Sequence, residues 1–120
     1  TGNYCLSAGF YDAYYKKACQ VKEVLKKEFK AAFKKCDAII APVSPTTAFK
    51  IGAKKSPLEM YLADVYTVPV NIVGVPAISF PVAKDSNGLP IACQLIADFW
   101  KEGVLYTLAN THEVMRGGKW

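Results

Sequence analysis

The chain has 120 residues, 52% of them hydrophobic, and a formal net charge of +5. This length suits one domain and not two, and the apolar content is high for a small free-standing one. Almost all of the positive charge is lysine, because Arg116 is the only arginine; the composition therefore argues against a sequence-reading nucleic-acid site, which relies on arginine forks.

Residues 11–36 form the first predicted element, a long amphipathic helix. Apolar residues recur there at helical spacing, and eight lysines lie between them. The lysines are Lys16, Lys17, Lys22, Lys26, Lys27, Lys30, Lys34 and Lys35. A solvated helix face is favoured over a phosphate-binding surface for this basic side.

Residues 37–41 read as a short buried strand that runs into a proline-rich loop, residues 42–47. Loops beyond the carboxyl ends of strands are where ligands collect in open α/β sheets. Ser44, Thr46 and Thr47 are therefore pocket candidates. A proline-shaped turn with hydroxyl caps is an equal alternative.

A second helix is predicted to begin at Ser56-Pro57-Leu58-Glu59, where Ser56 caps and Glu59 closes a capping box. We expect it to end near Tyr66, because Pro69 disfavours helical geometry at Val68. Its expected core stripe is Leu58, Tyr61, Leu62 and Val65. The uncharged residues 65–83 are long enough to suggest a membrane span, but three prolines interrupt them, which indicates a buried, irregular interior segment.

Two strands, residues 77–82 and 91–96, flank the turn signal Asp85-Ser86-Asn87-Gly88 and are predicted to form an antiparallel hairpin. A last helix is predicted over residues 101–115. His112 lies on or beside its inward stripe, and a packed histidine is the expected role.

Asp64 is the most informative single residue, because a carboxylate in the last turn of a helix meets the negative end of the helix dipole. Such a charge favours a nearby cation. The residues alone leave two candidates open, a lysine in a structural salt bridge and the ammonium group of a ligand.

No other residues form a recognisable catalytic constellation. The four cysteines contain no CxxC pair, so zinc is improbable and reduced thiols are expected. The sequence contains no glycine-rich phosphate loop, metal triad, or nucleophile with its base.

Several stretches occur together, in order, in one protein family. They are residues 6–18 (LSAGFYDAYYKKA), 41–49 (APVSPTTAF), 60–64 (MYLAD), 71–79 (NIVGVPAIS), 88–90 (GLP) and 94–96 (QLI). The series resembles the A subunits of the glutamyl-tRNA(Gln)/aspartyl-tRNA(Asn) amidotransferases, which belong to the amidase signature family.

The resemblance implies an α/β fold in which residues 1–120 are a single partial domain. This is the C-terminal part of the amidase-signature mixed sheet, flanked by helices, with a long N-terminal helix and a late β-hairpin. It also implies that the lysine and two serines that hydrolyse the amide lie N-terminal to this region. The chain is then expected to have no catalytic residue and to be inactive alone.

In that family the A subunit releases ammonia from glutamine, a B subunit uses it to amidate Glu-tRNA(Gln) or Asp-tRNA(Asn), and a small C subunit clasps the A subunit. ATP, Mg²⁺ and most of the tRNA contact are expected in the B subunit, with no cofactor or metal in this chain. The expected location is the cytoplasm or an organellar matrix, without membrane contact.

By its place in the MYLAD stretch, Asp64 is similar to the aspartate that holds the α-amino group of glutamine. The resemblance thus favours the ligand role over the salt bridge. Tyr61, Thr67, Ser44 and Thr46 are the further substrate-binding candidates.

Three departures from the family concern Ala83, Ala92 and Ala97, where glycine is usual; each adds a methyl group. Two other functions remain open. One is a general amidase acting on small amides. The other is a non-catalytic basic module that binds RNA or protein through its lysine-lined helix.

Overall fold

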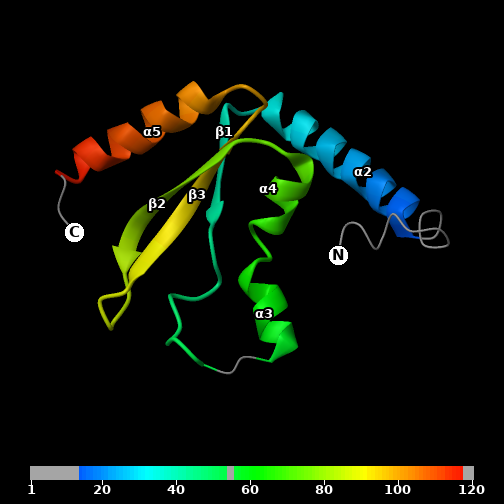
Figure 1. Cartoon of the computed structure of the whole chain (residues 1–120). Coiled ribbons are helices and arrows are strands. Elements are labelled where there is room, and N and C mark those ends of the chain that lie inside the picture. Colours follow the sequence, from blue (N-terminus) through cyan, green and yellow to red (C-terminus); the bar gives the residue numbers. More distant parts are fainter. Residues whose placement is uncertain (1–13, 54–55, 118–120) are drawn as a thin grey trace.

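The computed structural model describes residues 14–53 and 56–117 as a three-stranded sheet with helices on both sides (Figure 1). The elements in chain order are α2 (Lys16–Phe33), β1 (Ala38–Pro42), α3 (Pro57–Ala63), α4 (Val68–Val73), β2 (Ala77–Lys84), β3 (Pro90–Ala97) and α5 (Glu102–Met115). The predicted α/β class, long N-terminal helix and late hairpin are confirmed. The first three residues of the predicted helix, 11–13, lie outside the described residues.

The strand order is β1-β3-β2, and both pairings are antiparallel. Proline removes a ladder donor and is therefore confined to outer strands or strand starts; Pro81 lies in the outer strand β2, and Pro90 opens the central β3. The predicted turn closes the hairpin, with Gly88 at φ +80° in the left-handed region that glycine tolerates. A bulge interrupts the β2–β3 register between Pro81 and Ala83.

The two faces of the sheet pack against different helices, because side chains alternate along each strand. On one face Leu95 and Ala97 of β3 pack with Leu105 of α5, and Ile78 and Phe80 of β2 join them. On the other face Ile96 packs with residues of α2, α4 and the segment after α4. The members of this second cluster are Val70, Val73, Val75 and Ile96, with Leu25, Phe29, Phe33 and Ile39 packed against them.

The segment after the capping box differs from the prediction. The capping box itself is confirmed, because the Glu59 N–H donates to Ser56 Oγ and the Ser56 N–H donates to Glu59 Oε2. However, α3 ends at Ala63 instead of near Tyr66, and α4 begins at Val68. Pro69 sits in the first turn of α4, where a missing N–H costs no helical hydrogen bond, so the expectation of an irregular 65–83 segment was wrong.

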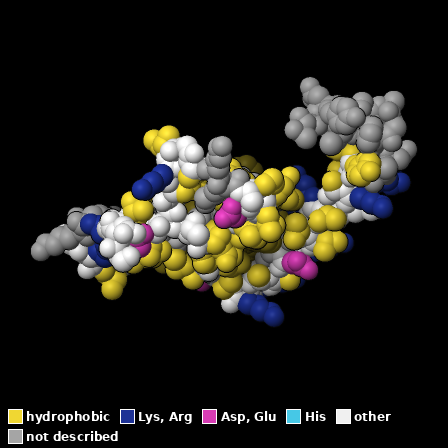
Figure 2. All heavy atoms as spheres, turned by 90° about the horizontal axis from the view of Figure 1, so that it is seen from below, with side chains coloured by type: hydrophobic (Ala, Val, Ile, Leu, Met, Phe, Trp, Pro, Cys, Tyr) yellow, Lys and Arg dark blue, Asp and Glu magenta, His cyan; other side chains and the backbone are white. Residues whose placement is uncertain are grey.

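The expected core stripe of α3 is exposed. Leu58 is 66% exposed, Tyr61 81% and Leu62 48%, and α3 has no buried residue. Figure 2 shows apolar side chains spread over the face seen from below, where α3 and the hairpin turn lie. The start of the helix was predicted correctly, but α3 buries none of its residues against the described part of the chain.

The molecule is flat and extended, with extents of 56 × 41 × 19 Å. Its radius of gyration is 17.6 Å, whereas a compact domain of this length has a radius of about 14 Å. No described helix combines the length and apolar character needed to cross a membrane.

Candidate substrate-binding site

Asp64 lies at the carboxyl end of α3, as the sequence predicted. It is the C-cap residue, and its backbone N–H donates to the carbonyls of Tyr61 and Leu62. Its side chain is exposed. Within residues 14–53 and 56–117 the ion pair found is Lys26–Glu23, on α2, so no described lysine neutralises the Asp64 carboxylate.

The loop after β1 forms a shallow wall whose shape is set by local hydrogen bonds. Ser44 Oγ accepts from the Thr46 N–H at 3.5 Å, which is the hydroxyl-capped turn that the prolines suggested. Thr47 Oγ1 donates to Asp85 Oδ2 at 2.9 Å and attaches the loop to the hairpin turn. Val43 extends the β1–β3 ladder through its N–H to the Ala92 carbonyl, 3.3 Å away.

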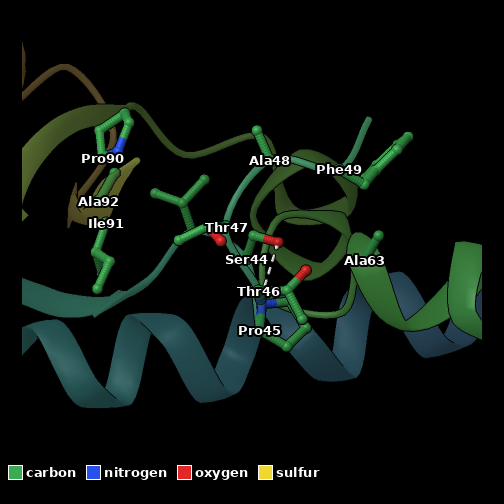
Figure 3. Close-up of a pocket in the computed structure, with 11 residues that line it drawn as sticks. Ser44, Pro45, Thr46, Thr47, Ala48, Phe49, Ala63, Pro90, Ile91 and Ala92 are labelled. Atoms are coloured by element: carbon green, nitrogen blue, oxygen red, sulfur yellow. Dashed lines mark hydrogen bonds between the residues drawn. The ribbon is translucent and has the colours of Figure 1, made fainter. Parts of the chain in front are cut away.

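This loop lines the larger concavity of the site, which has a volume of about 390 Å³. Figure 3 shows the loop between Ala63 of α3 and the first residues of β3. The lining residues are Val43, Ser44, Pro45, Thr46, Thr47, Ala48, Phe49, Ala63, Pro90, Ile91 and Ala92. Three sequence candidates, Ser44, Thr46 and Thr47, are thus brought together in one concavity, which Ala92 also lines.

A smaller concavity of about 270 Å³ lies between α4 and the sheet. It is lined by Val43, Thr67, Val70, Asn71, Val75, Ala77, Ile78, Ser79 and Gln94. Thr67, another sequence candidate, therefore belongs to this second concavity. Val43 lines both concavities, so they are neighbours.

Asp64 lies in the chain between Ala63, which lines the larger concavity, and Thr67, which lines the smaller one. The carboxylate itself is in the lining of neither. Tyr61 lines neither concavity either, and its side chain is 81% exposed. The structure thus groups Ser44 with Thr46, and places Asp64 on the turn that joins the two concavities.

Two polar residues that hold the site together were not among the sequence candidates. Asp85 accepts the N–H groups of Leu89 and Asn87 and the hydroxyl of Thr47. The Leu89 hydrogen bond is the main reason why the pKa of Asp85 lies below its ordinary value, with the Thr47 and Asn87 bonds adding to the effect and burial opposing it. The second is Gln94, whose signal in the sequence was an amide in the middle of an otherwise apolar strand.

The remaining titratable candidates lie elsewhere. His112 packs its ring edge-on against Phe80, with centroids 4.8 Å apart, as expected for a packed histidine. Cys19, Cys36 and Cys93 are free thiols, and Cys5 lies outside the described residues. The part of the chain that the structure describes contains no cluster of three or more His, Cys, Asp or Glu side chains able to hold a metal ion.

The site therefore offers hydroxyl and backbone groups for hydrogen bonding and one unneutralised carboxylate at its edge. Hydroxyls and carbonyls can orient a small polar ligand, and the carboxylate can bind a cationic group. These groups are suited to binding and positioning a ligand.

Comparisons with known proteins show which family this chain resembles. The chain is 54% identical, over 113 residues, to the A subunit of the glutamyl-tRNA(Gln) amidotransferase of Clostridium botulinum, a match that covers 93% of this chain and 23% of the relative. The crystal structure of the corresponding A subunit from Thermotoga maritima superimposes with a TM-score of 0.75 at 43% identity, over 88% of this chain and 23% of that one. A crystal structure described as an amidase superimposes with a TM-score of 0.72 at 27% identity, over 84% of this chain and 24% of that one.

The chain thus spans about a quarter of the length of these relatives. The Amidase family profile matches residues 1–106, which is most of the sequence. This chain belongs to the amidase family.

Proposed function

We propose that this chain is part of the glutamine-hydrolysing A subunit of a tRNA-dependent amidotransferase. The observation that carries the proposal is the contrast in identity: 54% and 43% to the A subunits of glutamyl-tRNA(Gln) amidotransferases, but 27% to the structure described as an amidase. This contrast favours the tRNA-linked enzyme over a general small-amide amidase. The high identity to an enzyme subunit also weighs against a non-catalytic basic module.

In this proposal the 120 residues form a partial, C-terminal portion of the amidase domain and contribute scaffold and substrate contacts. The lysine and serines that cleave the amide belong to the remainder of the domain. The ammonia passes to a B subunit, which binds ATP, Mg²⁺ and most of the tRNA, and a C subunit holds the assembly together. The complex would work in the cytoplasm or an organellar matrix.

Asp64 is proposed to bind the α-amino group of glutamine. Its support is the exposed carboxylate, the absence of a described lysine partner, and its place between the two concavities. A carboxylate at a helix carboxyl end is destabilising by about 0.3–1 kcal/mol, so this position costs stability unless a cation compensates. The substrate ammonium group would be that cation.

The test is Asp64→Asn in the full-length protein, with its partner subunits, assayed for glutamine hydrolysis. A hydrogen bond to a charged group is worth roughly 1.5–3 kcal/mol, so we expect KM for glutamine to rise about tenfold to a hundredfold. The melting temperature should be unchanged or slightly higher, because the unfavourable charge at the helix end is gone.

Asp37→Asn is the matched control, because Asp37 is an exposed acid that lines neither concavity and precedes β1, whereas Val43, which lines both, follows it. It should leave KM and kcat unchanged. An Asp64→Asn enzyme with the KM of the unsubstituted protein would remove Asp64 from the site. A protein without any glutamine hydrolysis would refute the amidotransferase proposal itself.

A further inference from the structure

Gln94 is the one buried polar side chain among the described residues, with 4% of its surface exposed. It lies in the middle of the central strand β3, on the sheet face that packs against α2 and α4. Burying an amide is costly unless its donors are satisfied. The hydrogen bonds that the buried amide makes therefore indicate its structural role.

Both contacts are made by the side-chain nitrogen, and both acceptors are backbone carbonyls. Gln94 Nε2 donates to the Pro42 carbonyl at 3.0 Å and to the Tyr66 carbonyl at 2.9 Å. Pro42 is 52 residues away in the sequence and Tyr66 is 28 residues away. β1 and β3 are already joined by their backbone ladder, so what the amide adds is a direct link from the turn at Tyr66 to both strands.

The two acceptors belong to the two parts of the candidate site. Pro42 is the last residue of β1 and directly precedes the loop that lines the larger concavity. Tyr66 lies in the turn between α3 and α4, two residues after Asp64 and one before Thr67. Gln94 therefore contacts both the residue before the loop and the turn that follows Asp64, and it also lines the smaller concavity.

We propose that Gln94 is a positioning residue that holds the Asp64 turn at a fixed place relative to the 43–49 loop, and thereby sets the affinity for the amino-acid substrate. This inference rests on the proposed function for its substrate, but not for its geometry. A glutamine amide is suited to this position, because its two N–H groups can donate to the two carbonyl acceptors. A glutamate of the same shape has at most one donor, and a methionine has none.

The experiment uses the full-length protein with Gln94→Met, which keeps the size of the side chain, and Gln94→Glu, which keeps its shape. Glutaminase kinetics and site-resolved amide hydrogen exchange are measured together. We expect KM for glutamine to rise about tenfold while kcat changes less than about twofold, because a misplaced carboxylate weakens binding and leaves the reacting groups in place. Exchange should accelerate at the amides of residues 64–68 and 43–47, and remain unchanged in α5 and in the hairpin turn, residues 85–88.

Gln20→Met is the control. Gln20 has an exposed side-chain amide on α2, so its replacement removes the same chemical group without affecting the hydrogen bonds to the Pro42 and Tyr66 carbonyls. It should alter neither KM nor exchange. An exchange increase in Gln94→Met that is equally large in α5 and the hairpin turn would show a general packing role and overturn the proposal. An unchanged KM with unchanged exchange would overturn it as well.

The two proposals fail in distinguishable ways. If the unsubstituted protein does not hydrolyse glutamine, the proposed function is wrong, whereas the exchange pattern still decides the role of Gln94. Local acceleration confined to residues 64–68 and 43–47 supports the positioning role in that case too. If glutamine is hydrolysed and both Gln94 variants bind it normally, the proposed function stands and the inference about Gln94 is rejected.

Discussion

Asp85 joins the hairpin turn to the loop that lines the larger concavity. Its Oδ1 accepts the N–H groups of Asn87 and Leu89, at 2.8 and 2.9 Å, and its Oδ2 accepts the Thr47 hydroxyl. All three donors favour the ionised carboxylate, and the bond from Leu89 is the strongest cause of the lowered pKa of Asp85. The charge of one residue therefore stabilises both the turn and the loop.

The lowered pKa predicts how this link responds to acid. A carboxylate whose pKa is lower in the folded state than in the unfolded state contributes stability that is complete above its ordinary value, 3.8, and is lost as pH falls through the folded-state pKa. We expect the protection of the Asn87 and Leu89 amides, measured relative to intrinsic exchange at each pH, to fall only below about pH 4. In Asp85→Asn this acid step should disappear, and exchange at neutral pH should already be faster; a pH series of amide exchange tests both.

For single residues, the sequence predicted where a residue lies in its helix or strand better than it predicted the hydrogen-bond partners of that residue. Asp64 was predicted to lie near a helix end because Pro69 was expected to stop the helix, and its place is confirmed, although the helix ends earlier than expected, at Ala63. The role of Gln94 could not be predicted, because its acceptors are carbonyls 52 and 28 residues away and only the folded sheet brings them together. The link between Thr47 and Asp85 was hidden for the same reason.

The stability of α3 depends strongly on the hydrogen bonds at its ends. It has seven residues and buries none of them against the described part of the chain. Helices this short are unstable in water without tertiary packing or caps. Its capping box satisfies the Glu59 and Ser56 N–H groups, and Pro57 pre-sets the first turn.

Replacing the cap should therefore loosen α3. Ser56→Ala is expected to destabilise the helix by about 1 kcal/mol, which corresponds to roughly fivefold faster exchange of the amides of residues 59–63. Amide exchange of the full-length protein measures this locally, where a global melting curve would hide it. Ser86→Ala, in the exposed hairpin turn, is the matched control and should leave α3 unchanged; equal exchange in both variants would show that the cap adds nothing to the helix.

The elements themselves were mostly predictable, because strong local signals specified them. The helical period of apolar residues predicted α2, and the Asn-Gly turn between two β-rich runs predicted the hairpin. The break between α3 and α4 was not predicted correctly, because Pro69 begins a helix that it was expected to prevent. A proline signals a helix start as readily as a helix end, and only the backbone around Thr67 distinguishes the two.

The molecule as a whole exposes an unusual amount of large apolar surface. Exposed side chains include Ile51, fully accessible, and Met115, at 83%, while only seven apolar residues of the described part are buried. Together with the radius of gyration of 17.6 Å, this exposure is expected when most of the apolar surface packs against another part of a protein. The relatives have about three quarters of their length beyond the region that this chain matches, and we infer that the corresponding segment is the packing partner.

The 120-residue chain produced by itself should therefore not behave as a compact monomer. We expect strong binding of a hydrophobic dye, a broad non-cooperative melting curve, and association that increases with concentration. The full-length protein should bind little dye and melt cooperatively. Light scattering and calorimetry on the two samples test the prediction, and a sharp cooperative transition of the isolated chain would contradict it.

The strand order described above has a consequence for assembly. β1 and β2 each pair with β3 alone among the described strands, so one side of each has no described strand partner. Such open edges are templates on which further strands add. If the chain is part of a longer amidase domain, as proposed, these edges would allow the sheet to continue into the rest of that domain. In the isolated chain we expect the same edges to recruit other copies and promote fibrous aggregates.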